Sequence, residues 1–504
     1  MKKTGVLSIF LGIALLLSAC GQQPAAPTEL DVTQPAQTQP TAPNRAETFG
    51  LAYDPMAGFN PYRCTTLINR SVMSLLYQGL FSITSSYQAE PVLCKTFSVS
   101  QDLKTYTFTL ENARFSSGIA LTAADVAASL QAARNSAVYG DRLKHVAGIS
   151  PQEDGTLVLT LDTPYENLPL LLDIPIVPAD ETEESQPHGT GPYRLIAGGE
   201  TLRLEQVQNW WSDYPSAIDF DTLYLNAAAS PSEVRNEFEF GNTDLVCADP
   251  SAKTYVPFRC DYELWDCATG ILLYLGCNRG AGPFSNGAVR SALTHGVKRE
   301  SLIGCYSGFA EAAYLPASPA SSFYEETLAS QYGYDPGIFS DALANAGLKN
   351  TSAILLVDGD DPARVKAAEA IAADLNECGL LVTVDQRTGE SYKTALEQGQ
   401  FDLYLGQIRL SPNFDLSPFF EEGGAANYGS MASGTTYALC LAALENSGNY
   451  YELHKAVMDS GQLCPLLLRT YAVYATRGAV SNLLPGLDNV FHTSNSRQLS
   501  DAKT

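Results

Sequence analysis

The sequence predicts an α/β fold in which mixed sheets are flanked by helices. The clearest sign lies within residues 353–384, where an apolar strand, the loop DGDDP, a helix ending near Gly379 and a second apolar strand follow one another. This order is typical of a βαβ unit with two parallel strands. Residues 104–130 predict a strand, a loop and a helix, and 504 residues suffice for two or three domains.

The stretch 104–130 shows how such a unit is encoded. Residues 105–110 alternate threonine with large apolar side chains, as expected of a strand with one buried face. After a break at Gly118, Thr122 and Asp125 stand at the spacing of a helix capping box. The apolar stripe of the helix that follows consists of Val126, Leu130 and Ala133.

Further strands and helices follow along the body of the chain. Alternating or apolar runs predict strands within 155–172, at 193–195, within 263–278 and at 466–474. One helix is expected between Pro61 and Leu76, and another after an N-cap at Ser285. A third is expected from Asp335 to Gly347, which would end it.

The first 47 residues differ in composition from the body. Residues 1–19 combine two lysines with a short apolar run, which predicts a signal peptide. Their ending, LSAC, resembles a bacterial lipobox, so we expect Cys20 to be acylated and to become the mature N-terminus; the alternative is a plain signal peptide with an incidental cysteine. Residues 20–47, rich in Pro, Gln and Thr, predict a lipidated cysteine followed by a disordered tether. No later stretch has 18 uninterrupted apolar residues.

Charge and cysteine content narrow the class of protein. A net charge of −24 argues against nucleic-acid binding, because it repels phosphate backbones. Ten cysteines follow Cys20 without any C-x-x-C pair. In an exported protein they could form disulfides, with Cys260 and Cys267 as the nearest pair, or stay as small buried thiols, and the sequence leaves both open.

The sequence contains no recognisable catalytic or metal motif. The five histidines are scattered, and G-x-S-x-G, H-E-x-x-H and Walker patterns do not occur. The turn HGTGPY lacks the G-K-[ST] of a phosphate loop, and we expect Gly189 and Gly191 to permit a tight turn instead. Asp358, Asp360 and Asp361 precede Pro362 and are interpreted as charges at a helix N-terminus rather than calcium ligands. We therefore predict no catalytic residues, no cofactor and no metal site.

The amino-acid sequences of several segments resemble those of one protein family. FSSGIALTAADVAASL resembles the "F-x-[DS]-G-x-x-[LF]-T-A-x-D-V-x-x-S-[LF]" segment of the family 5 extracellular solute-binding proteins, the oligopeptide, dipeptide and nickel receptors of ABC importers. Further similar motifs are NP at 60–61, LYQGLF at 76–81, HGTGPY at 188–193 and the segments 283–293 and 335–348. The resemblance covers residue 48 to about residue 490.

This resemblance implies a two-lobe fold like that of periplasmic binding proteins, with an extra N-terminal subdomain and a ligand cleft at the hinge. Lobe I would span 48–262, including the inserted subdomain at about 70–170. Lobe II would span 263–470, and 471–504 would return to lobe I and form the C-terminal tail.

The resemblance also implies where a ligand would be held. Ligand contacts are expected from the loop after NP, from the first crossover strand and from a loop of lobe II, which here supply Tyr62, Asn69, Thr269, Gly270, Tyr274, Arg409, Asn413 and Asp415. Tyr62 and Tyr274 could instead be core aromatics, and Asn413 could only cap a turn.

The chain departs from its peptide-binding relatives in this last loop. Their "W-x-[AS]-D-Y-x-D-P" segment, whose aspartate pairs with the amino terminus of the ligand, is replaced by GQIRLSPNFDLSPFF. Asp415 could hold a peptide amine, or Arg409 could pair with a carboxylate or phosphate.

The sequence as a whole predicts an extracytoplasmic lipoprotein of an ABC importer. It would capture oligopeptides, dipeptides or a similar small solute by lobe closure and deliver it to a permease with its ATPase. We expect a monomer that contacts the membrane only through its lipid anchor. The alternatives are a peptide-sensing lipoprotein without transport, a secreted hydrolase or, within the family, a receptor for nickel or another non-peptide ligand.

Overall fold

The computed structural model describes residues 48–198, 201–213, 218, 220–480, 482–487 and 489–492. The signal peptide, the acylated Cys20 and the tether expected before residue 48 lie outside the described residues. The description below concerns the unit of structure that begins at Arg45. Among the described residues, no helix has both the length and the apolar character needed to cross a bilayer.

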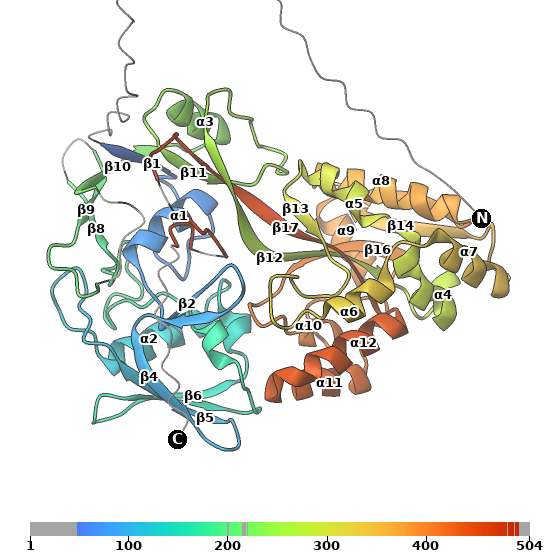
Figure 1. Ribbon diagram of the computed structural model, residues 1–504, viewed down its shortest axis with the longest axis horizontal. Coiled ribbons are helices and arrows are strands. Elements are labelled where there is room, and N and C mark those ends of the chain that lie inside the picture. Colours follow the sequence, from blue (N-terminus) through green and yellow to red (C-terminus); the bar gives the residue numbers. More distant parts are fainter. Residues whose placement is uncertain are drawn as a thin grey trace, which may run out of the picture. The chain divides into compact units, whose positions relative to one another are not determined.

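Eleven strands of the described chain form one continuous mixed sheet (Figure 1). Their order is β15 (Leu381–Arg387), β14 (Ser352–Asp358), β16 (Leu403–Arg409), β12 (Glu263–Cys277), β17 (Leu463–Ala475), β11 (Leu245–Ala248), β1 (Phe49–Tyr53), β10 (Thr222–Ala227), β9 (Arg203–Gln206) and β8 (Tyr193–Ile196), with β13 (Ala310–Ala312) paired to β17. The long antiparallel strands β12 and β17 pair with strands of both lobes and therefore form the hinge. The strands predicted at 193–195, 263–278 and 466–474 are confirmed.

The strand directions bring two sheet edges toward each other. In lobe I, β1 pairs in parallel with β10 and β11, and in lobe II, β14 pairs in parallel with β15 and β16. β11 is antiparallel to β17, which enters lobe I, and β16 is antiparallel to β12, which enters lobe II. The carboxyl ends of both parallel sets therefore point toward the hinge.

The N-terminal subdomain is built on a second, antiparallel sheet. Its strand order is β4 (Cys94–Val99), β5 (Thr105–Leu110), β7 (Leu157–Leu161) and β6 (Val146–Pro151), and a separate hairpin pairs β2 (Phe81–Ile83) with β3 (Ala89–Pro91). The predicted strand and capping box are confirmed. The Thr122 hydroxyl accepts a hydrogen bond from the Asp125 N–H, and the Asp125 carboxylate accepts one from the Thr122 N–H.

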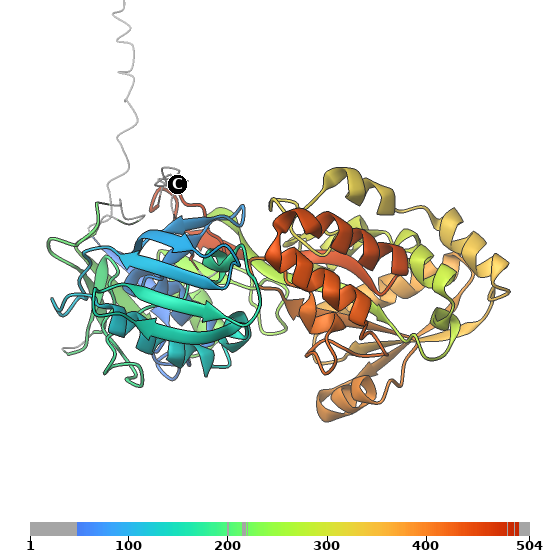
Figure 2. The ribbon, with the colours of Figure 1, turned by 90° about the horizontal axis from the view of Figure 1, so that it is seen from below.

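Helices flank the sheets as predicted. They are α1 (Leu67–Leu76), α2 (Ala123–Arg134), α3 (Pro231–Glu239), α4 (Gly287–Ala292), α5 (Arg299–Leu302), α6 (Glu326–Ala329), α7 (Pro336–Asn345), α8 (Pro362–Glu377), α9 (Gly389–Glu397), α10 (Ser417–Phe420), α11 (Gly434–Glu445) and α12 (Tyr450–Ser460). Figure 2 shows α11 and α12, in orange-red, lying against each other.

The helix ends test three sequence predictions. The helix expected from Asp335 is confirmed, with Asp335 as its N-cap and Gly347 just beyond its end at a φ of 72°. The N-cap expected at Ser285 is wrong, because a short 3₁₀ turn occupies 283–285 and Asn286 caps α4 through its side-chain oxygen. Asp361 caps α8, in agreement with its interpretation as a charge at a helix N-terminus.

The glycines of HGTGPY are required for a different reason from the one expected. Neither Gly189 nor Gly191 is among the described glycines that have a positive φ. A Cβ on Gly189 would lie 1.9 Å from the Leu76 carbonyl oxygen, and one on Gly191 would lie 2.4 Å from that of Leu75. The turn therefore needs glycine because it packs directly against the end of α1, where the Gly191 N–H donates to the Leu76 carbonyl.

The ten described cysteines are thiols, and eight of them are buried. Cys260 and Cys267, the pair nearest in sequence, are not joined. Burial raises the pKa of Cys94 to about 12. Of the two possibilities that the sequence left open, the structure therefore supports small buried thiols.

Candidate ligand-binding cleft

The carboxyl edge of the parallel strands in lobe I borders a cavity. β1 lies between β11 and β10, so the chain leaves neighbouring strands in different directions at this edge, where open α/β sheets commonly bind ligands. The cavity has a volume of about 280 Å³ and is lined by residues at the ends of all three strands and at the starts of α1 and α3. Its wall is mostly apolar, and its polar members include Asp54, Thr66, Ser230, Asp249 and Thr254.

The matching edge of lobe II is rich in charge. β14 ends at Asp358, and Asp361 accepts hydrogen bonds from the backbone N–H groups of Ala363 and Arg364, each at 3.1 Å. The Arg364 guanidinium lies 3.3 Å from the Asp361 carboxylate and 3.8 Å from that of Asp358. The described residues contain no group of three or more His, Cys, Asp or Glu side chains arranged for a metal ion.

A buried arginine joins the two edges at the hinge. The side chain of Arg469, on β17, is 6% exposed. Its Nη2 donates to the Asp249 carboxylate at 2.6 Å, just beyond β11 of lobe I, and its Nη1 donates to the Gln407 Oε1 at 2.8 Å, on β16 of lobe II. Nη2 also donates to the Ser251 hydroxyl. One side chain thus ties lobe I, the hinge and lobe II together.

We call Arg469, Asp249, Ser251, Gln407 and Tyr306 the hinge cluster. Two hydrogen-bond donors of this cluster have no partner within the described chain. They are the Arg469 Nε–H and the hydroxyl of Tyr306, both buried. The guanidinium carbon lies 5.1 Å from the centroid of the Tyr306 ring, a cation–π distance. Burial raises the pKa of Tyr306 well above its usual value, so the hydroxyl keeps its proton and remains a donor.

The two predicted residues that follow β1 lie in the interior of lobe I. The Tyr62 hydroxyl donates to the Pro175 carbonyl at 2.9 Å. Asn69 is fully buried, and its amide donates to the carbonyls of Asp54 and Gly58 and accepts from the Asp54 N–H. These contacts brace the loop after β1, which favours a structural role for both residues.

The three predicted residues on β12 also have interior partners. The Thr269 hydroxyl donates to the Arg469 carbonyl at 2.5 Å and accepts from the Ile271 N–H. Gly270 has a φ of 71° at the register shift between 268 and 271, where a Cβ would lie 2.9 Å from a backbone oxygen. Tyr274 is buried with its ring centroid 5.0 Å from that of Phe419. These interior contacts fix the conformation and packing of the hinge strand, which favours a structural role for all three residues.

The three predicted residues of the lobe II loop differ in exposure. Arg409 is exposed at the carboxyl end of β16. The buried Asn413 donates to the Tyr165 hydroxyl, and the Asp415 carboxylate lies 3.2 Å from the Lys144 ammonium. Tyr165 and Lys144 belong to the N-terminal subdomain, so Asn413 and Asp415 connect lobe II with that subdomain.

The family is settled by sequence comparison. The model described as "Bacterial extracellular solute-binding proteins, family 5 Middle" matches residues 88–427. The chain belongs to this family. The resemblance found in the sequence and the two-lobe α/β fold that it implied are thereby confirmed.

Relatives of this family 5 protein differ in what they bind. The chain is 25% identical over 308 residues to the glutathione-binding protein GsiB of Escherichia coli (strain K12), which is 58% of this chain and 59% of that protein. The chain thus spans about three-fifths of the length of the curated relatives it matches.

Two solved structures share the fold. NikZ from Campylobacter jejuni in complex with Ni(L-His) has a TM-score of 0.64 and 20% identity, covering 88% of this chain and 96% of that one. The oligopeptide-binding protein AppA from Bacillus subtilis in complex with a nonapeptide has a TM-score of 0.59 and 18% identity, covering 85% and 94%. The matching proteins are binding proteins, and the family works outside the cytoplasm with ABC permeases.

Sequence reasoning missed the residues of the hinge cluster in this family 5 protein. Arg469 was visible as a lone charge inside the apolar run LLLRTYAVY, and a charge in a buried strand requires partners. Asp249, Gln407 and Tyr306 carry no comparable signal, because they are far from Arg469 in the sequence and meet it only in the folded chain.

Proposed function

We propose that this protein is a lipid-anchored receptor that captures a peptide or a similar small solute between its two lobes and delivers it to an ABC permease. The observation that carries the proposal is the hinge cluster, where Arg469 bonds to Asp249 of lobe I and Gln407 of lobe II. A solute that contacts both edges favours the closed arrangement, because it gains affinity only when they approach each other.

The proposed site combines the apolar cavity of lobe I with the charged edge of lobe II. Arg409 offers a guanidinium to a carboxylate of the solute, and the Tyr306 hydroxyl and Arg469 Nε–H are buried donors without partners in the described chain. An apolar wall with few polar groups suits a peptide side chain. A peptide ligand also agrees with the peptide-binding and glutathione-binding relatives.

We keep the division of the chain as part of the proposal. Lobe I spans 48–262 with its subdomain at about 70–170, lobe II spans 263–470, and 471–504 returns to lobe I. β12 begins at Glu263, which supports the first boundary, and β17 continues to Ala475 beside β11 of lobe I.

Identification of the bound solute tests the proposed ligand class. Protein purified without denaturation is heated, and the released molecules are analysed by mass spectrometry and titrated back by calorimetry. The proposal expects peptides or molecules with peptide bonds that rebind at one per chain. Release of non-peptidic solutes alone would refute the peptide class, and the absence of any solute that rebinds would refute the receptor.

The lipid anchor has a separate test. Cells fed a labelled fatty acid are expected to label the wild-type chain and not the Cys20→Ala variant, which should leave the membrane fraction. Equal labelling of the two chains would show that the acylated residue is not Cys20.

A further inference from the structure

The N-terminal subdomain contacts lobe II through residues outside the hinge strands. Glu166, which follows β7, donates its backbone N–H to the Leu444 carbonyl in α11 at 2.7 Å. Its carboxylate accepts a hydrogen bond from the Ser447 N–H, just beyond α11, also at 2.7 Å. Figure 1 shows α11 on the side of lobe II that faces the subdomain. One residue of the subdomain thus makes two hydrogen bonds with backbone groups of lobe II.

Buried polar side chains extend this contact. The Asn413 amide of lobe II donates to the Tyr165 hydroxyl of the subdomain, and the Tyr450 hydroxyl donates to the Asn413 carbonyl. All three residues are buried. Beside them, the Lys144 ammonium of the subdomain lies 3.2 Å from the Asp415 carboxylate of lobe II. The contact therefore combines a buried polar centre with an ion pair.

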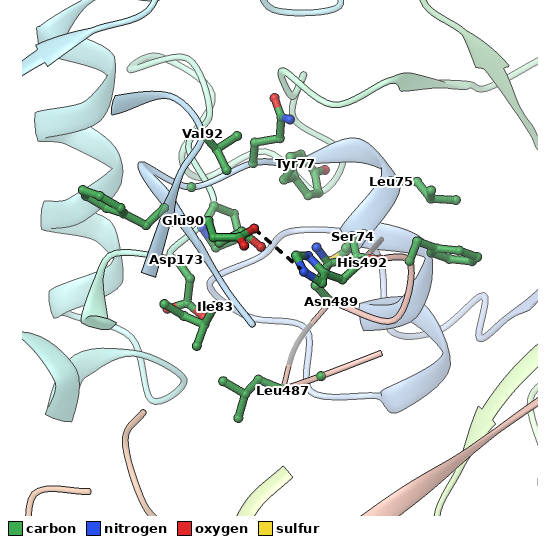
Figure 3. A pocket seen from close by; sticks show the side chains of 18 of the residues that line it. Ser74, Leu75, Tyr77, Ile83, Glu90, Val92, Asp173, Leu487, Asn489 and His492 are labelled. Carbon is green, nitrogen blue, oxygen red and sulfur yellow. Dashed lines mark ion pairs between the residues drawn. The ribbon is translucent and has the colours of Figure 1, made fainter. Parts of the chain in front are cut away.

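The β2–β3 hairpin adds an aromatic contact. The ring centroid of Tyr87, in the turn of this hairpin, lies 4.7 Å from that of Phe414 in lobe II, and both residues are buried. The hairpin itself is fixed to lobe I, because Phe81 of β2 packs in the core of that lobe. Figure 3 shows Glu90 of β3 and His492 of the C-terminal segment pointing toward each other, 3.9 Å apart.

These contacts depend on how the two lobes are placed. Strands β5 and β7 of the subdomain share one hydrophobic core with β1 and β10, so the subdomain moves together with lobe I. A rotation of lobe II about β12 and β17 that displaces α11 by about 1 Å would stretch the hydrogen bonds of Glu166 beyond the limit of about 3.5 Å. Separation of the lobes therefore breaks the contacts.

We propose that the subdomain is a latch that holds lobe II against lobe I and is released when the lobes separate. The latch consists of Tyr87, Lys144, Tyr165 and Glu166 together with their partners in lobe II. By favouring the closed arrangement it raises the affinity for a solute, although none of these four residues belongs to the proposed solute site. The effect on affinity rests on the proposed function, whereas the latch itself can be tested without a solute.

Hydrogen exchange of the solute-free protein tests the latch. The chain is freed of solute by unfolding in guanidinium chloride and refolding, and amide exchange is followed residue by residue by mass spectrometry. The Glu166 N–H is the reporter, because its acceptor belongs to lobe II. If the lobes separate without unfolding, this amide should exchange faster than those of β5, which pairs with strands on both sides, and its rate should rise less steeply with urea.

Two variants weaken different parts of the latch. Tyr165→Phe removes the hydroxyl that accepts from Asn413, and Lys144→Met removes the cation next to Asp415. Each should speed exchange of the Glu166 amide at least about fivefold, because the closed arrangement loses a hydrogen bond or an ion pair. The control Glu153→Gln, at an exposed site of the same subdomain, should leave the rate unchanged.

Small-angle scattering adds a readout that local fraying around Glu166 would not change. The radius of gyration of the solute-free double variant Tyr165→Phe, Lys144→Met should exceed that of the wild type. Protection of the Glu166 amide equal to that of β5, an unchanged rate in a folded variant, or an unchanged radius in the double variant would overturn the latch. Failure of the receptor proposal would appear separately, as the absence of a solute that rebinds.

Discussion

Replacement of Arg469 by methionine tests the hinge cluster directly. The change removes hydrogen bonds to Asp249, Ser251 and Gln407 and leaves the Asp249 carboxylate, 22% exposed, without its cation. Removing one partner of a buried ion pair destabilises a protein by about 3–5 kcal/mol. We therefore expect the free energy of unfolding, measured by urea titration of tryptophan fluorescence, to fall by that amount.

The double variant Arg469→Met, Asp249→Asn separates the ion pair from simple loss of packing. The amide that Asp249→Asn introduces would need no cation. The double variant should therefore lose at least about 1 kcal/mol less unfolding free energy than the two single variants lose in sum. A loss below about 1 kcal/mol for Arg469→Met, or strict additivity in the cycle, would refute the role given to the pair.

Three further predictions concern stability. His454 is fully buried, and burial lowers its pKa to about 3. Between pH 7 and pH 5 its imidazole therefore binds a proton in the unfolded chain but not in the folded chain, which destabilises the fold. The free energy of unfolding should fall by about 2 kcal/mol less in His454→Leu than in the wild type over this pH range. Gly191→Ala should cost about 1–3 kcal/mol in urea titrations, because its Cβ would lie 2.4 Å from a backbone oxygen, whereas Gly434→Ala, with open space around it, should be nearly neutral. Lys144→Met removes an ion pair with Asp415 whose side chains are 30% and 10% exposed, and it should cost about 1–3 kcal/mol, a loss that should shrink in about 1 M salt.

Much of the fold could be predicted from local sequence because the local signals agree with the tertiary structure. The alternating residues 105–110 and the Thr122 box form the strand and capped helix that their pattern predicts. The N-cap at Ser285 failed because Pro283 starts a 3₁₀ turn first, which moves the cap by one residue. Such a shift depends on packing that the pattern does not encode.

The site was less predictable, because it depends on contacts between distant segments. Asn69 and Thr269 lie in the regions that the resemblance indicated, yet their polar atoms bond to the protein itself. Asp415 lies in the expected loop, but its partner is Lys144, 271 positions earlier in the chain. Only the order β16-β12-β17 places Gln407 beside Arg469.

Small-angle scattering with the solute released from the native protein tests the central claim most directly. If the two carboxyl edges close on the solute, the radius of gyration should fall on saturation and recover when the solute is removed. Arg409→Met should weaken binding without altering the radius of the solute-free protein. An unchanged radius at saturation, or conversion of the solute into products, would contradict a receptor that works by lobe closure.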